Sequence, residues 1–118
     1  MTNHFWGKYA EFLARCLFRA KGYSILETNY VTGKGTHAGE IDFIARKHTQ
    51  LVFVEVKKRK NLDDAAYAIK EKQQERIVKG AEAFLKKHPF CQNDEMRFDV
   101  VLVELPFKIK HIKNAWQF

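Results

Sequence analysis

The sequence predicts an α/β fold in which helices pack on a mixed β-sheet, and three patterns support this class. Apolar residues recur at helical spacing over residues 5–21. Two apolar runs, at 40–46 and 51–57, are separated only by the polar stretch KHTQ, which is typical of two strands joined by a turn. A second helical pattern over about 61–87 is followed by further strand-like sequence. The resulting order, α-β-β-β-α-β-β, is that of a mixed sheet with helices packed on it.

The N-terminal part of the chain is expected to form a helix, a strand and a loop. Gly22 follows the first helical pattern, where the C-terminus of a helix favours a left-handed residue. The stretch YSILETNY, residues 23–30, has the character of a strand. Residues 31–39, VTGKGTHAG, form an exposed loop that is loosened by its glycines. The apolar residues of the helical pattern are Tyr9, Phe12, Leu13, Cys16, Leu17 and Ala20.

The C-terminal part is expected to form a long helix and two strands. A helix-rich stretch begins near Asn61, a candidate N-cap with Asp64 at N3, continues to about Lys87 and is closed by Pro89. The clearest following strand is 96–105, and 107–116 is expected at an edge of the sheet, where its lysines discourage further pairing. The buried face of the helix contains Ile69, Ile77, Ala81, Phe84 and Leu85.

The composition suits one compact domain. The chain has 118 residues, of which 46% are hydrophobic, and we expect a single domain over residues 1–118. No basic and apolar leader opens the chain, and charged residues interrupt every apolar run, so the expected location is cytoplasmic. Cys16 and Cys91 lie far apart without a CxxC motif, which argues against a zinc site or a disulfide framework. Cys16 is expected in the core.

The chain is strongly basic, with 21 Lys and Arg against 14 Asp and Glu and a formal net charge of +7. This balance favours a negatively charged partner, either nucleic acid or an anionic membrane surface. A membrane partner is disfavoured, because no basic amphipathic helix and no lipidation motif is evident. We therefore expect nucleic acid as the partner, with DNA favoured over RNA. The oligomeric state is left open.

Four charged residues interrupt the two central strands. With KHTQ as the turn, Glu40 lies opposite Lys57 and Asp42 lies opposite Glu55. Because side chains alternate between the faces of a strand, all four share one face and one end of the pair. The other face is a continuous apolar surface formed by Ile41, Phe43, Ala45, Val52, Val54 and Val56.

Asp42 and Glu55 need charge compensation in this register. Opposite residues bring their Cβ atoms within about 5 Å, and two carboxylates at that separation repel by roughly 3 kcal/mol. A Mg²⁺ ion held by the two carboxylates, a backbone carbonyl and waters would supply it. Alternatively one acid holds a proton, or Lys57 neutralises both. In a fourth interpretation Glu40 and Lys57 form an ion pair, and the other two acids lie at a solvated strand end.

Asp42 and the triplet Glu55-Val56-Lys57 resemble the D…ExK signature of the PD-(D/E)xK, restriction-endonuclease-like nuclease superfamily. More closely, GEIDFIA, VFVEVKKR and RFDVV, in this order, resemble the YraN family of small bacterial proteins, which are regarded as endonucleases by inference. The resemblance spans nearly the whole chain, from the first helix to HIKNAW. It implies a three-layer α/β/α fold and metal-dependent hydrolysis of phosphodiester bonds in nucleic acid, with Mg²⁺ or Mn²⁺ as the cofactor.

The resemblance also implies roles for the matching residues. Asp42 and Glu55 would hold the metal, and the carbonyl of Val56 would add a ligand. Lys57 would orient the attacking water or help to deprotonate it, and would stabilise charge on the phosphate.

Four further residues match accessory positions of the superfamily or the family. Glu11 matches an acid that some superfamily members supply from the first helix, although Glu11 and Arg15 also have the spacing of an ordinary ion pair. Glu40 matches the GEID motif and could steer a second metal. Gln73 or Gln74 matches a polar position near the site of related nucleases, but a solvated helix face is the favoured interpretation for both.

Basic residues flank the acidic cluster, and cations in this position would let a polyanion approach a site that otherwise repels it. The loop 31–39 could close over a bound strand. His37 in this loop is interpreted as a surface histidine, and Asp99 as a strand-end contact or cap without a catalytic role. The residues expected to bind nucleic acid are Lys34, Lys58, Arg59, Lys60, Lys72 and Arg76.

Two classes of function therefore follow from the sequence. The first is a metal-dependent nuclease that uses Asp42, Glu55 and Lys57. The second is a non-catalytic nucleic-acid-binding or scaffolding module that keeps the nuclease fold. A divalent ion held by the two acids separates the first class from the second.

Overall fold

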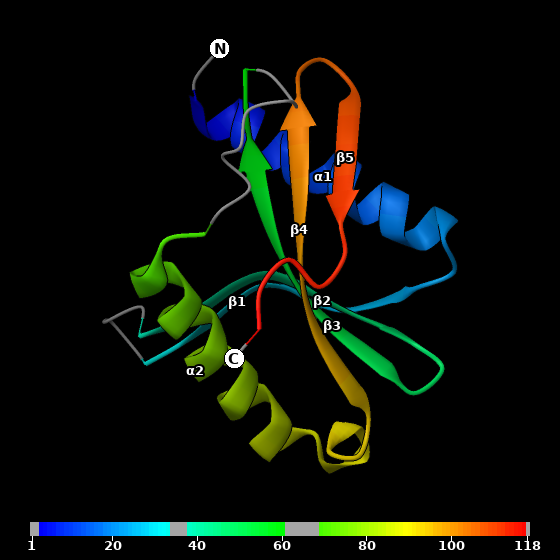
Figure 1. Ribbon diagram of the computed structural model, residues 1–118, viewed down its shortest axis with the longest axis vertical. Helices are drawn as coiled ribbons and strands as arrows, with labels where there is room; N and C mark the ends of the chain where they lie inside the picture. The colour runs from blue at the N-terminus through cyan, green and yellow to red at the C-terminus, as the bar shows by residue number, and fades with distance from the viewer. Residues whose placement is uncertain (1–2, 34–37, 61–68, 118) are drawn as a thin grey trace.

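The computed structural model describes residues 3–33, 38–60 and 69–117 and has the predicted α/β class, a five-stranded mixed sheet between two helices (Figure 1). The strands lie in the order β1-β2-β3-β4-β5; β3 and β4 are parallel, and the other neighbours are antiparallel. The elements are α1 (Asn3–Ala20), β1 (Ser24–Thr32), β2 (Gly39–Lys47), β3 (Gln50–Lys58), α2 (Glu71–Lys87), a 3-10 turn (Pro89–Cys91), β4 (Glu95–Glu104) and β5 (Lys108–Ile112).

Apolar clusters on both faces of the sheet produce three layers, with α2 in front of the sheet and α1 behind it in Figure 1. Because β3 and β4 are covered on both faces, their sequences are nearly continuous apolar runs. The cluster under α1 contains Ala10, Ala14, Phe18, Tyr23, Phe43, Ala45, Val52, Val54, Val101 and Val103. The cluster under α2 contains Ile41, Ile44, Leu51, Phe53, Ile69, Ile77, Ala81, Phe84, Cys91, Val100 and Leu102.

Helix α1 ends where the sequence predicts, but its outer face differs from the prediction. Gly22 has a φ of 94°, which a glycine adopts without strain, and the chain turns there into β1. Cys16 is exposed, so its predicted place in the core is wrong. The reason is that Ala10, Ala14 and Phe18, spaced four residues apart, form the buried stripe, and Cys16 lies off it.

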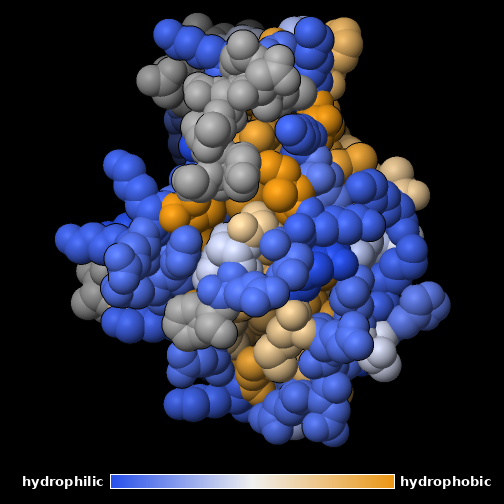
Figure 2. Space-filling view, in the orientation of Figure 1, coloured by the Kyte–Doolittle hydropathy of each residue, from blue (hydrophilic) through white to orange (hydrophobic). Residues whose placement is uncertain are grey.

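The second helix is shorter than predicted. Lys70 has an extended backbone (φ −61°, ψ 145°), and α2 begins at Glu71, so a continuous helix from Asn61 to residue 87 is wrong. Asn61 and Asp64 lie outside the described residues. Most polar residues of α2 are exposed, and hydrophilic side chains cover much of this side of the molecule (Figure 2). In the described part of the chain, no helix is long and apolar enough to span a membrane.

The central hairpin has the predicted register from Phe43 to Lys47, but the predicted pairs of Asp42 with Glu55 and of Glu40 with Lys57 are not strand pairs. Phe43 pairs with Val54 and Lys47 pairs with Gln50, so the turn consists of His48 and Thr49, and His48 has a left-handed φ of 55°. Beyond the Phe43 and Val54 pair the two strands separate, because β2 continues with β1 while β3 continues with β4. We call this point the fork; Figure 1 shows β1 and β2 curving toward α2 from it.

The fork changes the face on which one predicted core residue lies. The alternation predicts Ile41 on the same apolar face as Phe43. In the structure Ile41 instead belongs to the cluster under α2. Beyond Phe43, β2 follows α2, and Gly80 makes this close approach feasible. A Cβ atom on Gly80 would lie 2.9 Å from Cδ1 of Ile41.

Candidate active site at the fork

The fork brings Asp42 and Glu55 together on the side of the sheet that faces α2. The backbone N–H of Val56 donates a hydrogen bond to Oδ2 of Asp42 (2.7 Å), so a side chain replaces a backbone acceptor at this step of the hairpin. Asp42 and Glu55 line one small pocket of about 60 Å³, and Glu40, Gln73 and Arg76 complete its lining. We call it the carboxylate pocket.

Glu55 is only 6% exposed, and its surroundings disfavour its charged form. Burial, followed by a hydrogen bond with the Asp42 carboxyl and the charge of Asp42, raises the pKa of Glu55 well above its usual range. The nearby Lys57 acts in the opposite direction. The raised pKa favours the protonated form of Glu55, and a proton there would relieve its repulsion with Asp42. The sequence allows several ways to compensate the two acids. For the site without a bound ion, the raised pKa of Glu55 favours a protonated acid.

Gln73 links Glu55 to Lys57 from the first turn of α2. Its Nε2 donates a short hydrogen bond to Oε2 of Glu55, and its Oε1 accepts one from Nζ of Lys57 (2.8 Å). The expectation of a solvated helix face is therefore wrong for Gln73. Gln74 points elsewhere, because its Nε2 donates to the carbonyl of Ile69 (2.9 Å).

The two remaining acids are Glu11 and Glu40, and of these Glu40 lines the carboxylate pocket. Glu11 is half-buried on α1 and pairs with Arg15 at 4.0 Å, the ordinary helix pair that its spacing allows. Burial, and then the charge of Asp42, raises the pKa of Glu11. Glu11 does not line the carboxylate pocket but a separate one, with His4, Gly7, Lys8 and Asn29. Glu40 is exposed and lines the carboxylate pocket. Among the described residues no ion pair joins Glu40 to Lys57, because β2 and β3 have separated there.

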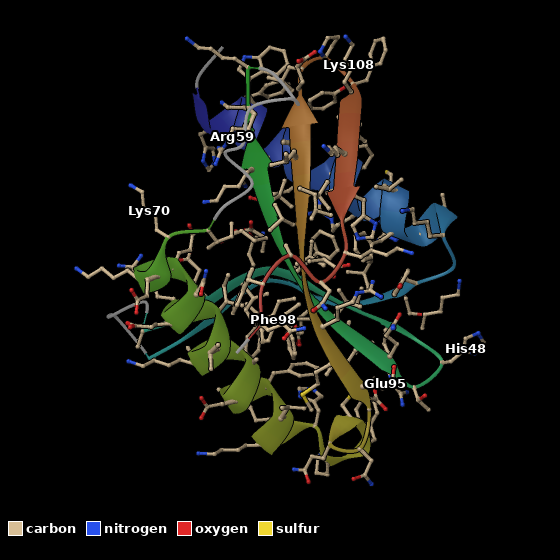
Figure 3. All side chains as sticks on the ribbon, viewed as in Figure 1. His48, Arg59, Lys70, Glu95, Phe98 and Lys108 are labelled. Carbon is tan, nitrogen blue, oxygen red and sulfur yellow. The ribbon has the colours of Figure 1, made fainter. Side chains whose placement is uncertain are left out.

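The predicted basic residues that the structure describes lie at the end of β3, directly after it, and in α2, and Figure 3 shows Arg59 beyond the end of β3 and Lys70 at the start of α2. Lys58, Lys60 and Lys72 are exposed. Arg59 is half-buried, and its Nη1 donates to the carbonyl of Lys58 (2.9 Å). Arg76 is exposed and lines the carboxylate pocket itself, which its place in a charge run did not reveal. Lys34 and His37 lie outside the described residues.

The oxygen donors of the pocket fit a hard divalent cation. Mg²⁺ prefers carboxylate oxygens and retains several waters, and the pocket volume of about 60 Å³ is several times the ~10–15 Å³ that one water needs. In the part of the chain that the structure describes, no group of three or more His, Cys, Asp or Glu is arranged to hold a metal. Asp42 and Glu55 would thus be the protein ligands, together with water. The carbonyl of Val56 stays a predicted ligand.

Residues 10–103 match the family described as "Uncharacterised protein family UPF0102". A UPF0102 protein of Paramagnetospirillum magneticum is 43% identical over 94% of this chain and 86% of its own length. A UPF0102 protein of Nitrobacter winogradskyi is 44% identical over 93% of this chain and 90% of its own. One from a Bradyrhizobium species (strain BTAi1) is 50% identical over 93% of this chain and 78% of its own.

Proposed function

The chain belongs to the UPF0102 family, also known as the YraN family, and we propose that it is a metal-dependent nuclease that hydrolyses phosphodiester bonds in nucleic acid. The observation that supports this most is the convergence of Asp42, Glu55, Gln73 and Lys57 at the fork. Two nearly adjoining carboxyl groups, of which Glu55 is buried, need either a proton or a cation, and in this proposal a divalent ion takes the place of the proton that the raised pKa of Glu55 favours.

The chain's own residues supply the positioning. The N–H of Val56 fixes one oxygen of Asp42, and Gln73 holds Glu55 and Lys57 at a constant separation. Lys57 uses one N–H for Gln73 and keeps two for an attacking water or a phosphate oxygen. When bound, the divalent ion would act as a Lewis acid on the phosphate and lower the pKa of a coordinated water.

Basic residues around the pocket would bring the substrate to it. Arg76 on the pocket lining, together with the exposed Lys58, Lys60 and Lys72, would offset the negative charge of the acids and attract phosphates. DNA is favoured over RNA as the substrate, as the sequence predicts.

A non-catalytic nucleic-acid-binding module is the second candidate, and one observation favours it. Glu55 accepts a hydrogen bond from Gln73 and its raised pKa favours a proton, which would compensate the acids without a metal. In this case the fork would be a structural junction beside a basic surface.

A cleavage assay separates the two candidates. Labelled single-stranded, double-stranded and branched DNA, and matching RNA, are incubated with Mg²⁺ or Mn²⁺ and, in parallel, with a chelator. The nuclease proposal expects metal-dependent cleavage by the wild type and by Glu82→Ala, an exposed acid of α2 outside the pocket, and none by Asp42→Ala. If Asp42→Ala cuts as fast as the wild type at matched purity, the proposal is wrong.

A further inference from the structure

A second pocket lies at the other end of β3, beside the hairpin turn whose His48 is labelled in Figure 3. Its volume is about 430 Å³, within the range of roughly 300–1,000 Å³ of small-molecule sites. Gln50 at this pocket and Glu55 at the carboxylate pocket are five strand positions apart, roughly 17 Å at ~3.3 Å per residue. The lining consists of Tyr23, Lys47, His48, Thr49, Gln50, Arg97 and Lys113. We call it the cationic pocket.

The lining of this pocket is the electrostatic opposite of the carboxylate pocket. It contains two lysines and an arginine, and no carboxylate side chain of the described residues is part of it. Thr49 and Gln50 add a hydroxyl and an amide N–H that can also donate hydrogen bonds, whereas the hydroxyl of Tyr23 already donates to Oε1 of Gln50 (3.0 Å). The pocket therefore offers mostly donors, which suits a ligand whose polar atoms are acceptors.

Arg97 is held rigidly at the wall of the cationic pocket. Its Nε and Nη2 donate to the two oxygens of Asp99 (2.7 and 2.8 Å), and Nη2 also donates to the hydroxyl of Tyr23 (3.0 Å). Among the described residues no acceptor takes a hydrogen bond from Nη1. The side chain is 14% exposed, so this guanidinium is fixed in orientation while one end stays available. A preorganised arginine of this kind loses little entropy when it binds an anion.

A structural role explains Arg97 and Asp99 but not the lysines. Asp99 is fully buried, and its negative charge is matched by Arg97 behind the pocket wall. Nζ of Lys47 donates to the carbonyl of Lys21 (2.8 Å), a neutral partner, and lies 5.7 Å from the centre of the Tyr23 ring. Lys113 is exposed. The charges of both lysines therefore remain uncompensated within the pocket lining.

We propose that the cationic pocket binds a phosphate group, carried either by a free nucleotide or by the end of a nucleic-acid strand. A fully ionised phosphate presents acceptor oxygens only. Lys47, Arg97 and Lys113 come from three separate parts of the chain and supply charged donors to the pocket. A terminal phosphate, with nearly two negative charges, gains more from this lining than a phosphodiester with one. The site does not depend on the carboxylate pocket or on its chemistry.

The test measures binding in a chelator, where cleavage cannot occur. Amide chemical shifts of the uniformly labelled protein are followed during titration with inorganic phosphate, a nucleoside monophosphate, and a short DNA strand with and without a 5′-phosphate. Sodium chloride at matched ionic strength is the reference. Lys113→Ala and Lys47→Ala test the pocket, and Lys110→Ala, an exposed lysine of β5 outside it, is the matched control. Arg97 is left intact, because its loss would remove the guanidinium that forms an ion pair with the buried Asp99.

The expected result is saturable binding, with shifts centred on residues 47–50 and 113, that Lys113→Ala weakens about tenfold and Lys110→Ala leaves unchanged. Binding of the free nucleotide identifies a small-molecule source; preference for the phosphorylated strand alone identifies a strand end. Asp42→Ala should bind as the wild type does, which separates this result from any failure of the nuclease proposal. Shifts no larger than those with chloride, or equal affinities of the Lys113 and Lys110 variants, would overturn it.

Discussion

Asp42 and Asp99 are both acids within apolar strands, but their surroundings are opposite. Burial alone would raise the pKa of Asp99, but hydrogen bonds with His111, Arg97 and the backbone N–H of Asn114 outweigh it and lower the pKa. Asp42 instead has one backbone N–H and a neighbouring carboxyl group. Asp99 is therefore satisfied by the fold, whereas Asp42 keeps fewer partners and is the acid to which we assign the proposed metal.

The proposed roles of Asp42 as a metal ligand and of Lys57 as a cation beside the phosphate predict different effects of their substitution. Asp42→Ala should abolish cleavage but leave metal-free affinity for DNA equal or improved, because it deletes a negative charge that repels phosphate. Lys57→Ala should lower both the cleavage rate and the affinity for DNA, because it removes a cation and a group that orients water. The rate should fall by about 100-fold or more, and the affinity by less. Single-turnover cleavage and fluorescence anisotropy in a chelator measure the two quantities. Equal loss of affinity in both variants would contradict the assignment.

The satisfied acid predicts a pH-dependent stability. A lowered pKa means that the unfolded chain binds the proton of Asp99 more readily, so its stabilisation is complete above about pH 3.9 and is lost as the pH falls through the folded-state pKa. Asp99→Asn should cost about 3 kcal/mol at neutral pH, and its difference from the wild type should shrink in acid. Urea unfolding at several pH values measures this. Glu104→Gln, in a pair with the largely exposed Lys108, should cost less than about 1 kcal/mol at any pH.

At the scale of elements, the sequence predicts what is local and misses what packing decides. Turn position and alternation are local, so the register from Phe43 to Lys47 is confirmed. The fork is not local, because it depends on β2 following α2, and so Ile41 changes face. The Asp42 bond to the Val56 amide and the link through Gln73 result from the same packing. Asp42, Glu55 and Lys57 of the candidate site were therefore predictable, whereas the place of Gln73 between Glu55 and Lys57 was not.

The close packing of β2 on α2 predicts a steric effect at Gly39. A Cβ atom there would overlap Oγ1 of Thr32, a side-chain atom that can rotate away, and would lie 2.7 Å from the backbone nitrogen of Gly80, which cannot move without displacing the helix. Gly39→Ala should therefore lower the free energy of unfolding by about 2 kcal/mol and reduce cleavage, because it shifts the strand that contains Asp42. Chemical denaturation and the cleavage assay measure the two effects.

Gly7→Ala is the matched control for this substitution. Gly7 lies in α1, and a Cβ there would meet nothing within 4 Å. The alanine should stabilise the protein by about 0.5–1 kcal/mol through helix propensity alone. If Gly39→Ala is as stable as this variant, the strand and the helix are not in the contact described.

At the scale of the whole molecule, the charge has an arrangement that composition does not reveal. The net charge of +7 comes from the sequence alone, but the structure gathers three acids, Glu40, Asp42 and Glu55, at the fork, and cations line the pocket at the hairpin end. The residues of the cationic pocket come from positions 23, 47–50, 97 and 113. No local pattern joins them, so only the folded chain brings them together. A polyanion that approaches the carboxylate pocket must therefore be bound by the basic residues around it.

This requirement predicts a steep and residue-specific salt dependence of DNA binding. Each phosphate that a lysine neutralises releases condensed counterions, and contributes about 0.9 to the slope of log affinity against log salt. The double variant Lys58→Ala/Lys72→Ala, at two exposed positions beside the carboxylate pocket, should reduce that slope by up to about 2. Lys86→Ala/Lys87→Ala removes the same charge at the far end of α2 and should leave the slope nearly unchanged.

Anisotropy titrations in a chelator between about 50 and 200 mM salt measure both slopes. Equal reductions would mean that net charge alone attracts the nucleic acid, and an affinity that does not change with salt would remove nucleic acid as the partner.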